Sequence, residues 1–538
     1  MDIPEGTTLR FTTDGSVPTA SSAISTKGQF TISKTTNYVF RLFQDGYLPS
    51  VPVTRSYIKT DNEYTIPIIS IVGDKRYFTD PKIGIDCDGD GTNGKTGNGQ
   101  DQPRNYNCDW DRPVNFSYLS PDGQMLFNQD VNIAVSGGWT RSIYPRSMKL
   151  KSNKIFDGQN RFDFSFFPQK PYIRNKQLVI RNGGNDIWNN NSRFRDAALE
   201  TIIQRSGIDL DCQSYVPVIE YVNGELRGVL NMREPNNDKY AYANFGYDDE
   251  ELDAFENTTF KNGDDEAFKH LISLSKNVNG AGAYDEIKTL LDVDEFINYM
   301  AAEFYLGNDD WPDNNIKAYR SRLDGRFRYI SFDLDYTFNA WDRTIASSLT
   351  NYGPNGREKP IDTIILFVNL LNHNGFRKQF IDTFCLMGGS VFEVQRANSI
   401  VDELLAHVKP MTDLMRKSPN NLDRGHHTEE AANAIKNQLS NRMSKMVSAL
   451  QQPTAMRLSG VKKINAQLST DTECANLYIN GLEVPYAYFN GQLFFPISLE
   501  AKAPVGYTFA GWKKNATATN QIVTSRSEER RVGKECRS

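Results

Sequence analysis

Two carboxylates and an amide stand in one segment with the spacing that phosphoryl transfer uses. In LGNDDWPDNNIKAYR, Asp310 and Asn315 are five residues apart at the end of an apolar helix, and Asp333 follows a predicted strand in FDLD. Such a site needs one carboxylate to accept the proton of the attacking hydroxyl, and an amide and a second carboxylate to hold divalent metal. Asp and Asn are also common in loops, so the spacing alone is a weak signal.

The segments upstream strengthen this interpretation through their order. A turn with Gly137 and Gly138 in SGGWTRS comes first, then a strand with Lys149, a helix with Glu200, and a hairpin that ends near Glu234. Glycines let a backbone approach phosphate oxygens, and a lysine held by a carboxylate keeps its charge and its direction. This is the order of the N-lobe of a protein kinase, with Glu234 at the hinge.

The elements that must position these residues fall into a β-rich half and a helical half. Strands are expected around 67–72, 114–118, 131–135, 148–150 and 178–181, and a hairpin is predicted to turn at Asn223-Gly224. A helix at about 192–205 interrupts the strands, and helices follow over 266–275, 293–305, 361–372, 377–386, 391–407 and 428–451. The expected fold class is α+β, with a bilobal domain over 67–452 whose N-lobe is rich in strands and whose C-lobe is helical.

Both ends of the chain show a different pattern. Residues 1–58 alternate apolar and polar side chains between Gly, Pro and Asp turns, which is typical of a small antiparallel β-sandwich. Alternation returns over 455–525, where we expect a β-repeat module or, alternatively, a terminal sheet of the main domain. The last residues, 526–538, look like an in-frame sequencing adapter. We therefore expect a fragment of a longer protein, with its signal peptide outside the fragment.

Composition excludes several classes of partner. The 61 Lys and Arg against 66 Asp and Glu give a net charge of −5, which supplies no global field for nucleic acid. The longest apolar stretch, 364–371, is far shorter than the about 18 residues of a membrane helix, so no membrane span is expected. The six cysteines include no C-x-x-C pair, and Cys87 with Cys108 is the one pair that suggests a disulfide.

The motifs together resemble those of the CotH kinase family, atypical secreted or spore-coat kinases with a protein-kinase-like fold. The resemblance rests on DWDRPVN, GGWTRS, KLK, LVIRNGGND, FRDA, VNGELRGVLNMRE, YLGNDDWPDNNIKAYR and FDLD, in that order. It differs from eukaryotic-type kinases because Asn308 and Asp309, not His and Arg, precede Asp310. The N-terminal stretch, with TTDGSVPT and GYLPS, is similar to the fibronectin-type-III-like module found after chitobiase catalytic domains.

The resemblance implies a set of roles. Asp310 would be the catalytic carboxylate, and Asn315 and Asp333 would bind Mg²⁺ or Mn²⁺. Lys149 would pair with the phosphates of ATP, although Arg146 stands where relatives carry a lysine and competes for that role.

The remaining nucleotide contacts that the resemblance implies lie in the expected N-lobe. Gly137 and Gly138 would cover the phosphates, and Glu234 would lie at the nucleotide. Glu200 would be the partner of the lysine, with Asp196 as its competitor.

The expected function is therefore ATP- and metal-dependent phosphorylation of Ser or Thr on a secreted or surface protein, outside a bacterial cell. Two alternatives remain. The chain could be a catalytically inactive kinase-fold module that binds glycans or a cell surface through its β modules, or a transferase that moves another group of the nucleotide, such as AMP, to protein.

Overall fold

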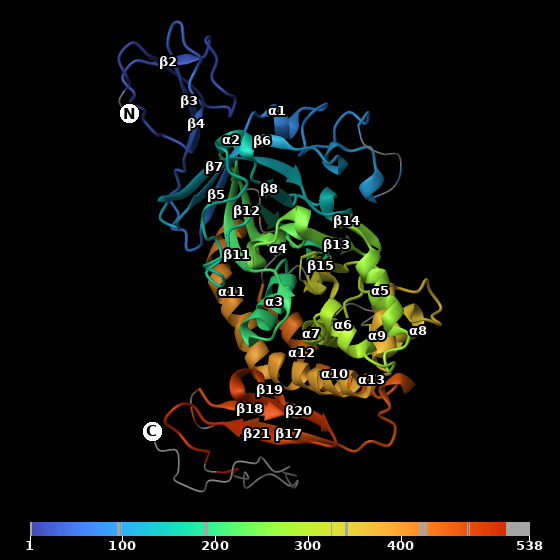
Figure 1. Ribbon diagram of the computed structural model, residues 1–538. Helices are drawn as coiled ribbons and strands as arrows, with labels where there is room; N and C mark the ends of the chain where they lie inside the picture. The colour runs from blue at the N-terminus through green and yellow to red at the C-terminus, as the bar shows by residue number, and fades with distance from the viewer. Residues whose placement is uncertain are drawn as a thin grey trace.

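The computed structural model describes residues 3–512 apart from 94–96, 98, 188–191, 324, 339–342, 419–421, 423–427, 471, 473 and 510. The predicted adapter sequence at 526–538 lies outside the described residues. A small N-terminal sheet, a β-barrel, a helical lobe and two small C-terminal sheets follow one another along the molecule (Figure 1).

The N-terminal sheet is antiparallel and has the strand order β2-β1-β3-β4. Its strands are β1 Thr8–Thr12, β2 Ala23–Ser25, β3 Thr36–Phe43 and β4 Val53–Tyr57. Leu9, Tyr38 and Phe40 form its buried core, and Phe11 and Phe30 pack against them. It contacts the next sheet through the hydroxyls of Ser56 and Ser70, 2.8 Å apart.

The β-rich lobe is a closed barrel of order β11-β12-β9-β8-β7-β6-β5. Its strands are β5 Ile68–Val72, β6 Arg112–Leu119, β7 Met125–Val135, β8 Met148–Lys151, β9 Gln177–Arg181, β11 Tyr215–Val222 and β12 Glu225–Arg233. The hairpin predicted at Asn223-Gly224 is confirmed, with φ of 49° and 79° at the two residues, as a two-residue hairpin turn of this kind requires. The short helices α1 Arg76–Thr79 and α2 Lys154–Asp157 lie in its connections.

A second sheet lies between the barrel and the helices, in the order β10-β16-β15-β13-β14. It contains β10 Asp211–Cys212, β13 Leu252–Glu256, β14 Thr259–Asn262, β15 Lys317–Ser321 and β16 Arg328–Ser331. The helices are α3 Arg195–Ser206, α4 Asp238–Phe245, α5 Glu266–Ser275, α6 Ala283–Leu290, α7 Val293–Leu306, α8 Ile345–Tyr352, α9 Asp362–Leu370, α10 Asn374–Leu386, α11 Val394–Lys417, α12 Glu429–Ser440 and α13 Arg442–Leu450. The expected α+β architecture with two lobes is confirmed.

Helix α11 connects the two lobes. Its apolar residues Val408, Met411 and Met415 share one buried cluster with Ile68 of β5 and Val229 of β12 on the barrel. Figure 1 shows α11 running beside β11, on the flank of the barrel. Since the N-terminal half of the same helix belongs to the core of the helical lobe, one continuous helix is anchored in both cores.

The C-terminal strands share the core of the helical lobe. They are β17 Lys463–Ser469, β18 Asn476–Ile479, β19 Leu482–Glu483, β20 Tyr488–Phe494 and β21 Leu499–Lys502. Their buried side chains belong to the same apolar cluster as the helices, and β20 lies against the π-helical turn Met387–Val391. A Cβ on Gly389 would lie 2.3 Å from the ring of Phe489, so this approach requires glycine.

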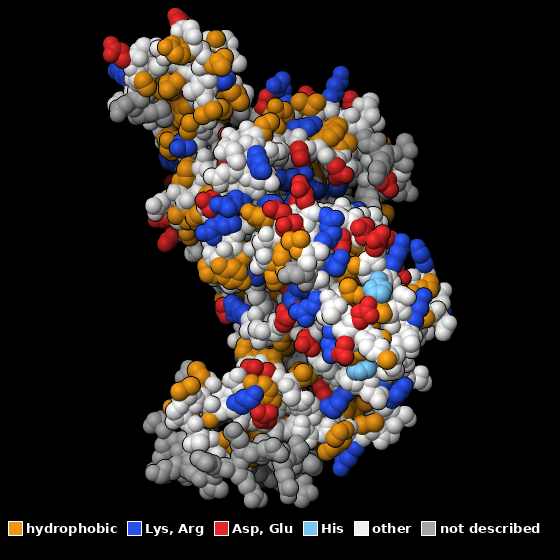
Figure 2. Space-filling view, viewed as in Figure 1, with side chains coloured by type: hydrophobic (Ala, Val, Ile, Leu, Met, Phe, Trp, Pro, Cys, Tyr) orange, Lys and Arg blue, Asp and Glu red, His pale blue; other side chains and the backbone are white. Residues whose placement is uncertain are grey.

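Two further expectations can be compared with the structure. Cys87 and Cys108 are both free thiols, so the suggested disulfide is wrong. Among the described helices, none combines the length and apolar character that a bilayer crossing requires. Figure 2 shows Lys and Arg side chains interspersed with Asp and Glu on this face, with no extended field of one sign.

Candidate active site

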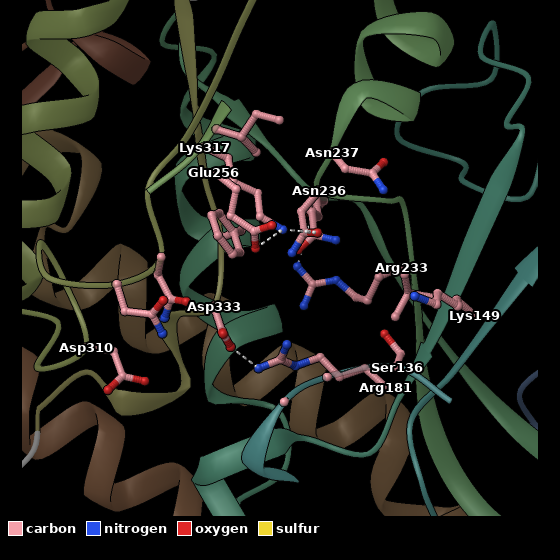
Figure 3. A pocket seen from close by; sticks show the side chains of 18 of the residues that line it. Ser136, Lys149, Arg181, Arg233, Asn236, Asn237, Glu256, Asp310, Lys317 and Asp333 are labelled. Atoms are coloured by element: carbon pink, nitrogen blue, oxygen red, sulfur yellow. Dashed lines mark hydrogen bonds and ion pairs between the residues drawn. The ribbon is translucent and has the colours of Figure 1, made fainter. Parts of the chain in front are cut away.

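A cavity of about 680 Å³ lies where the barrel, the second sheet and the loops after α7 and β16 meet. The volume is in the range of small-molecule and cofactor sites. Its lining includes Lys149 and Arg181 from the barrel and Asp310, Asn315 and Asp333 from the helical side. Figure 3 shows Asp310 and Lys149 on opposite sides of this space, with Asp333 between them.

The loops that carry the two aspartates are fastened to each other. Helix α7 ends at Gly307, which has a φ of 63°, and the chain then turns into the Asp310 loop. Asn308 donates a hydrogen bond of 3.2 Å to the backbone carbonyl of Asp333, and the indole of Trp311 donates one of 2.8 Å to Tyr299. Trp311 is fully buried, so this loop is anchored in the core rather than free on the surface.

Asn315 and Asp333 both have left-handed backbone conformations, each with φ of 59°. Asn and Asp adopt this region more readily than other residues, and non-glycine residues held in it occur both in turns and at functional sites. The Nδ2 atom of Asn315 is buried without a hydrogen-bond partner among the described residues. A rotated carboxamide would present its oxygen to a ligand in the cavity instead.

The electrostatic environment of Asp310 suits proton transfer. Burial, and then the negative charges of Asp333 and Asp313, raise its pKa to about 6, while Arg343 acts in the opposite direction. A carboxylate with a pKa near the working pH is ionised at pH 7 and yet basic enough to accept a proton from a hydroxyl. The shift also shows that the two cavity aspartates interact, because Asp333 is the largest charge contribution.

Lys149 lies on β8, which pairs with β9 so that Lys149 is opposite Val179. Lys149, Val179 and Arg181 all line the cavity. Burial, followed by the charge of Lys151, lowers the pKa of Lys149. In the described part of the chain, no carboxylate lies within ion-pair distance of its ammonium.

The expected partner of this lysine binds another residue. Glu200 lies 2.7 Å from Arg233, and Asp196 lies 2.6 Å from the same guanidinium. All three side chains are buried. Burial raises the pKa of Glu200 well above its usual range, whereas Arg233 and Arg181, acting against burial, lower that of Asp196 to about 2. The structure therefore places neither candidate acid on Lys149.

Arg146 and Glu234 also lie outside the lining of the cavity. Arg146 forms an ion pair of 2.9 Å with Asp86 and is thus held at the connection between α1 and β6. Glu234 is fully buried, lies 2.8 Å from Lys170 and accepts the backbone N–H of Ser214. Of the two basic residues that the sequence left open, the structure places Lys149 at the cavity and Arg146 away from it.

Gly137 and Gly138 do line the cavity, as the start of a short turn. Gly137 has a φ of 95°, which excludes most other residues. Arg141 of the same turn donates to the carbonyl of Gly137 and forms an ion pair of 2.9 Å with Asp109, which ties the turn to the chain before β6. The same lining includes Trp139, whose side chain remains largely exposed.

Arg181 was not assigned a role in the site from the sequence. Its guanidinium contacts the carboxylate of Asp333 (Figure 3) and also lies 2.6 Å from Asp335 and 3.5 Å from Asp196. The strand sequence QLVIR contains a weak signal for this residue. Gln177, Val179 and Arg181 alternate with the buried apolar residues of the strand, so one of its two faces is partly polar.

The donor set fits a hard divalent cation with a nucleotide. Asp310, Asn315 and Asp333 offer carboxylate and amide oxygens, which Mg²⁺ and Mn²⁺ prefer, and Lys149 lies across the cavity from Asp310. Within the described ranges, no group of three or more His, Cys, Asp or Glu residues is placed to hold a metal without help. Mg²⁺ commonly binds one or two carboxylates and completes its shell with phosphate and water.

These features define a two-lobed, kinase-like protein with its site between a β-barrel and a helical lobe. The family model for the CotH kinase protein matches residues 133–446, more than half of the chain, and the chain belongs to this family. A solved structure described as a Helicobacter pylori proinflammatory kinase, CtkA, is similar to it, with 14% identity over 55% of this chain and 98% of that one and a TM-score of 0.28. No curated protein matches the chain.

Proposed function

We propose that this protein is an atypical kinase that uses ATP and Mg²⁺ or Mn²⁺ to phosphorylate Ser or Thr of a protein. The observation that carries the proposal is that Asp310, Asn315, Asp333 and Lys149, contributed by both lobes, line one cavity. Membership of the CotH kinase family supports a kinase-like protein. The nucleotide, the metal and the acceptor residue are the proposed part.

In the proposed reaction, the substrate hydroxyl attacks the γ-phosphorus of ATP, Asp310 accepts the hydroxyl proton, and ADP leaves. Asp310 suits this role because its raised pKa of about 6 still leaves it ionised at neutral pH. Asn315 and Asp333 would hold the cation, whose contribution when bound is to neutralise charge on the phosphate oxygens. Lys149 and the backbone at Gly137 would orient the phosphates.

Lys149 is suited to phosphate because it lines the cavity and no carboxylate of the described residues lies within ion-pair distance of its ammonium. Burial and the neighbouring Lys151 lower its pKa, so an anion in the cavity would relieve an unfavourable environment. A lysine that already formed an ion pair with Glu200 would have less to gain. This arrangement favours a nucleotide-binding site over an inert kinase fold.

The proposed location is the outside of a bacterial cell, with a protein as the substrate. The N-terminal sheet has the strand pattern of an appended module and contributes no residue to the cavity. Binding of glycans or a cell surface through the β modules is a further part of the proposal that an independent binding assay must address.

Thermal unfolding with and without ATP and Mn²⁺ tests the proposal most directly, because a ligand that binds the native state raises its stability by mass action. Wild-type protein should gain several degrees with ATP and Mn²⁺ together, and Asp333→Asn should lose most of that gain. Asp402→Asn, which removes an exposed ion pair between Asp402 of α11 and Lys436 of α12, is the matched control and should keep that gain.

Mass spectrometry of Ser- and Thr-containing acceptor peptides then separates the alternatives. A phosphoryl adduct on an acceptor hydroxyl is expected from the wild type, and Asp310→Asn should abolish it. An adenylyl adduct would identify the AMP transferase instead. A folded wild-type protein with no ATP-dependent gain in melting temperature would contradict the proposal and favour a binding module.

A further inference from the structure

The guanidinium of Arg181 occupies the position of a counter-ion at the proposed metal ligand. It contacts Asp333 and also lies 2.6 Å from Asp335 and 3.5 Å from Asp196. Among the described residues, Arg181 is the one side chain within hydrogen-bond or ion-pair distance of the Asp333 carboxylate. Whatever binds this carboxylate must therefore compete with Arg181.

The other two carboxylates have additional partners that would hold Arg181 in place. Asp335 accepts the backbone N–H of Asn185 at 2.8 Å, and Asp196 forms its closer ion pair with Arg233 and accepts the N–H of Leu334. Both carboxylates are almost completely buried, whereas the Asp333 side chain is 26% exposed. Of the contacts of Arg181, the one to Asp333 is thus the most accessible to a ligand from the cavity.

The surrounding chain is shaped to admit this arrangement. Gly184 has a φ of 58°, and a Cβ on it would lie 2.1 Å from Asp335 and 2.8 Å from the Arg181 guanidinium. Any larger residue would therefore displace the pair, which gives the second glycine of the RNGGND segment a physical reason. One terminal nitrogen of Arg181, Nη2, makes the contacts to both Asp333 and Asp335, while the buried Nε faces Asp196 at 3.5 Å.

Resting on the function proposed above, we infer that Arg181 exchanges partners when the site is loaded. In the metal-free protein it neutralises Asp333. When a divalent cation binds Asp333, the guanidinium leaves that carboxylate, stays beside Asp335 and Asp196, and offers the Nη2 N–H released from Asp333 to a phosphate oxygen of the nucleotide. Arg181 would then oppose binding of the metal alone and favour binding of the nucleotide that accompanies it, so that metal and ATP bind cooperatively.

This exchange predicts effects of opposite sign in one variant. Arg181→Gln should bind Mn²⁺ alone about tenfold more tightly than wild type, because a competing charge-assisted contact is gone. At saturating Mn²⁺ the same variant should bind ATP about tenfold more weakly, because one phosphate contact is lost. The affinities of Arg181→Lys for Mn²⁺ and for ATP should lie between those of the wild type and those of Arg181→Gln. If Arg181 had a purely structural role, its substitution would weaken the binding of Mn²⁺ and of ATP together.

Electron paramagnetic resonance of free Mn²⁺ measures the first affinity and calorimetry with ATP the second, both on the full chain. Arg205→Gln is the matched control, because Arg205 forms its ion pair with Glu403 away from the cavity, and it should change neither affinity. Unchanged or weaker Mn²⁺ binding by Arg181→Gln, with wild-type binding of both ligands intact, would overturn the exchange and leave the proposed function standing. Failure of wild-type protein to bind either ligand would overturn both.

If Arg181→Gln does not fold, wild-type crystals prepared with and without Mn²⁺ decide the same question. The contact between Arg181 and Asp333 should be present without the metal and absent with it, while the contact to Asp335 persists. A contact to Asp333 that survives in the metal-loaded crystal would refute the inference.

Discussion

The raised pKa of Asp310 makes a quantitative prediction about the pH dependence of catalysis. With a pKa of about 6, about nine tenths of Asp310 is ionised at pH 7 and about one tenth at pH 5, so kcat/KM should fall about tenfold across this range. The value of kcat/KM falls toward low pH because a general base must be unprotonated in the free enzyme. A carboxyl at its ordinary pKa of 3.8 would still be more than about 90% ionised at pH 5 and would show almost no loss.

Two neighbouring charges allow this midpoint to be assigned to Asp310. Asp313 raises the pKa of Asp310 and Arg343 lowers it, and the two form an ion pair of 2.6 Å with each other. Asp313→Asn should therefore move the acid midpoint of kcat/KM down, and Arg343→Gln should move it up, each by roughly a few tenths of a pH unit and less at high salt.

The assay is initial-rate phosphorylation of an acceptor peptide at pH 5 to 8, with the wild type and both variants measured in the same buffers. Protonation of ATP is common to all three proteins, so the differences between their midpoints report on the protein. A wild-type midpoint below about pH 5, or equal midpoints in all three proteins, would refute the assignment of Asp310 as the base.

Three further outcomes are expected. Lys149→Ala should lose most ATP-dependent thermal stabilisation while Arg146→Ala keeps it, since Lys149 alone of the two lines the cavity; equal losses would contradict this placement. Arg233→Met should lower the free energy of unfolding in urea by about 3–5 kcal/mol, because Asp196 and Glu200 lose a buried partner, and a change below about 1 kcal/mol would argue against the network. Deletion of residues 1–58 should leave kcat/KM unchanged, because none of these residues lines the cavity. Loss of activity in a folded truncated protein would show that the site depends on them.

Local signals predicted those parts of the structure that depend on neighbouring residues. The Asn223-Gly224 turn could be predicted because both residues tolerate a positive φ. The spacing from Asp310 to Asp333 predicted one site because a short sheet connection lies between them, and both residues line the same cavity.

Local sequence patterns did not predict which side chains from distant segments would contact each other. Glu200 was expected near Lys149 because a kinase helix carries such a residue, but its side chain meets Arg233 across the barrel hairpin. The same limit hid Arg181, whose partner Asp333 lies on the other lobe. A buried charge finds its partner through the packing of the whole domain, which no short window of sequence contains.

Helix α11 has a consequence for how a ligand could reach the cavity. Because Val408, Met411 and Met415 lie in one apolar cluster with barrel strands while the start of the helix lies in the other lobe's core, swinging the lobes apart would expose that cluster to water. We expect a nucleotide to enter a cleft of nearly constant width, with the site largely preorganised before binding. Small-angle scattering curves of the ligand-free and nucleotide-loaded protein should then superimpose.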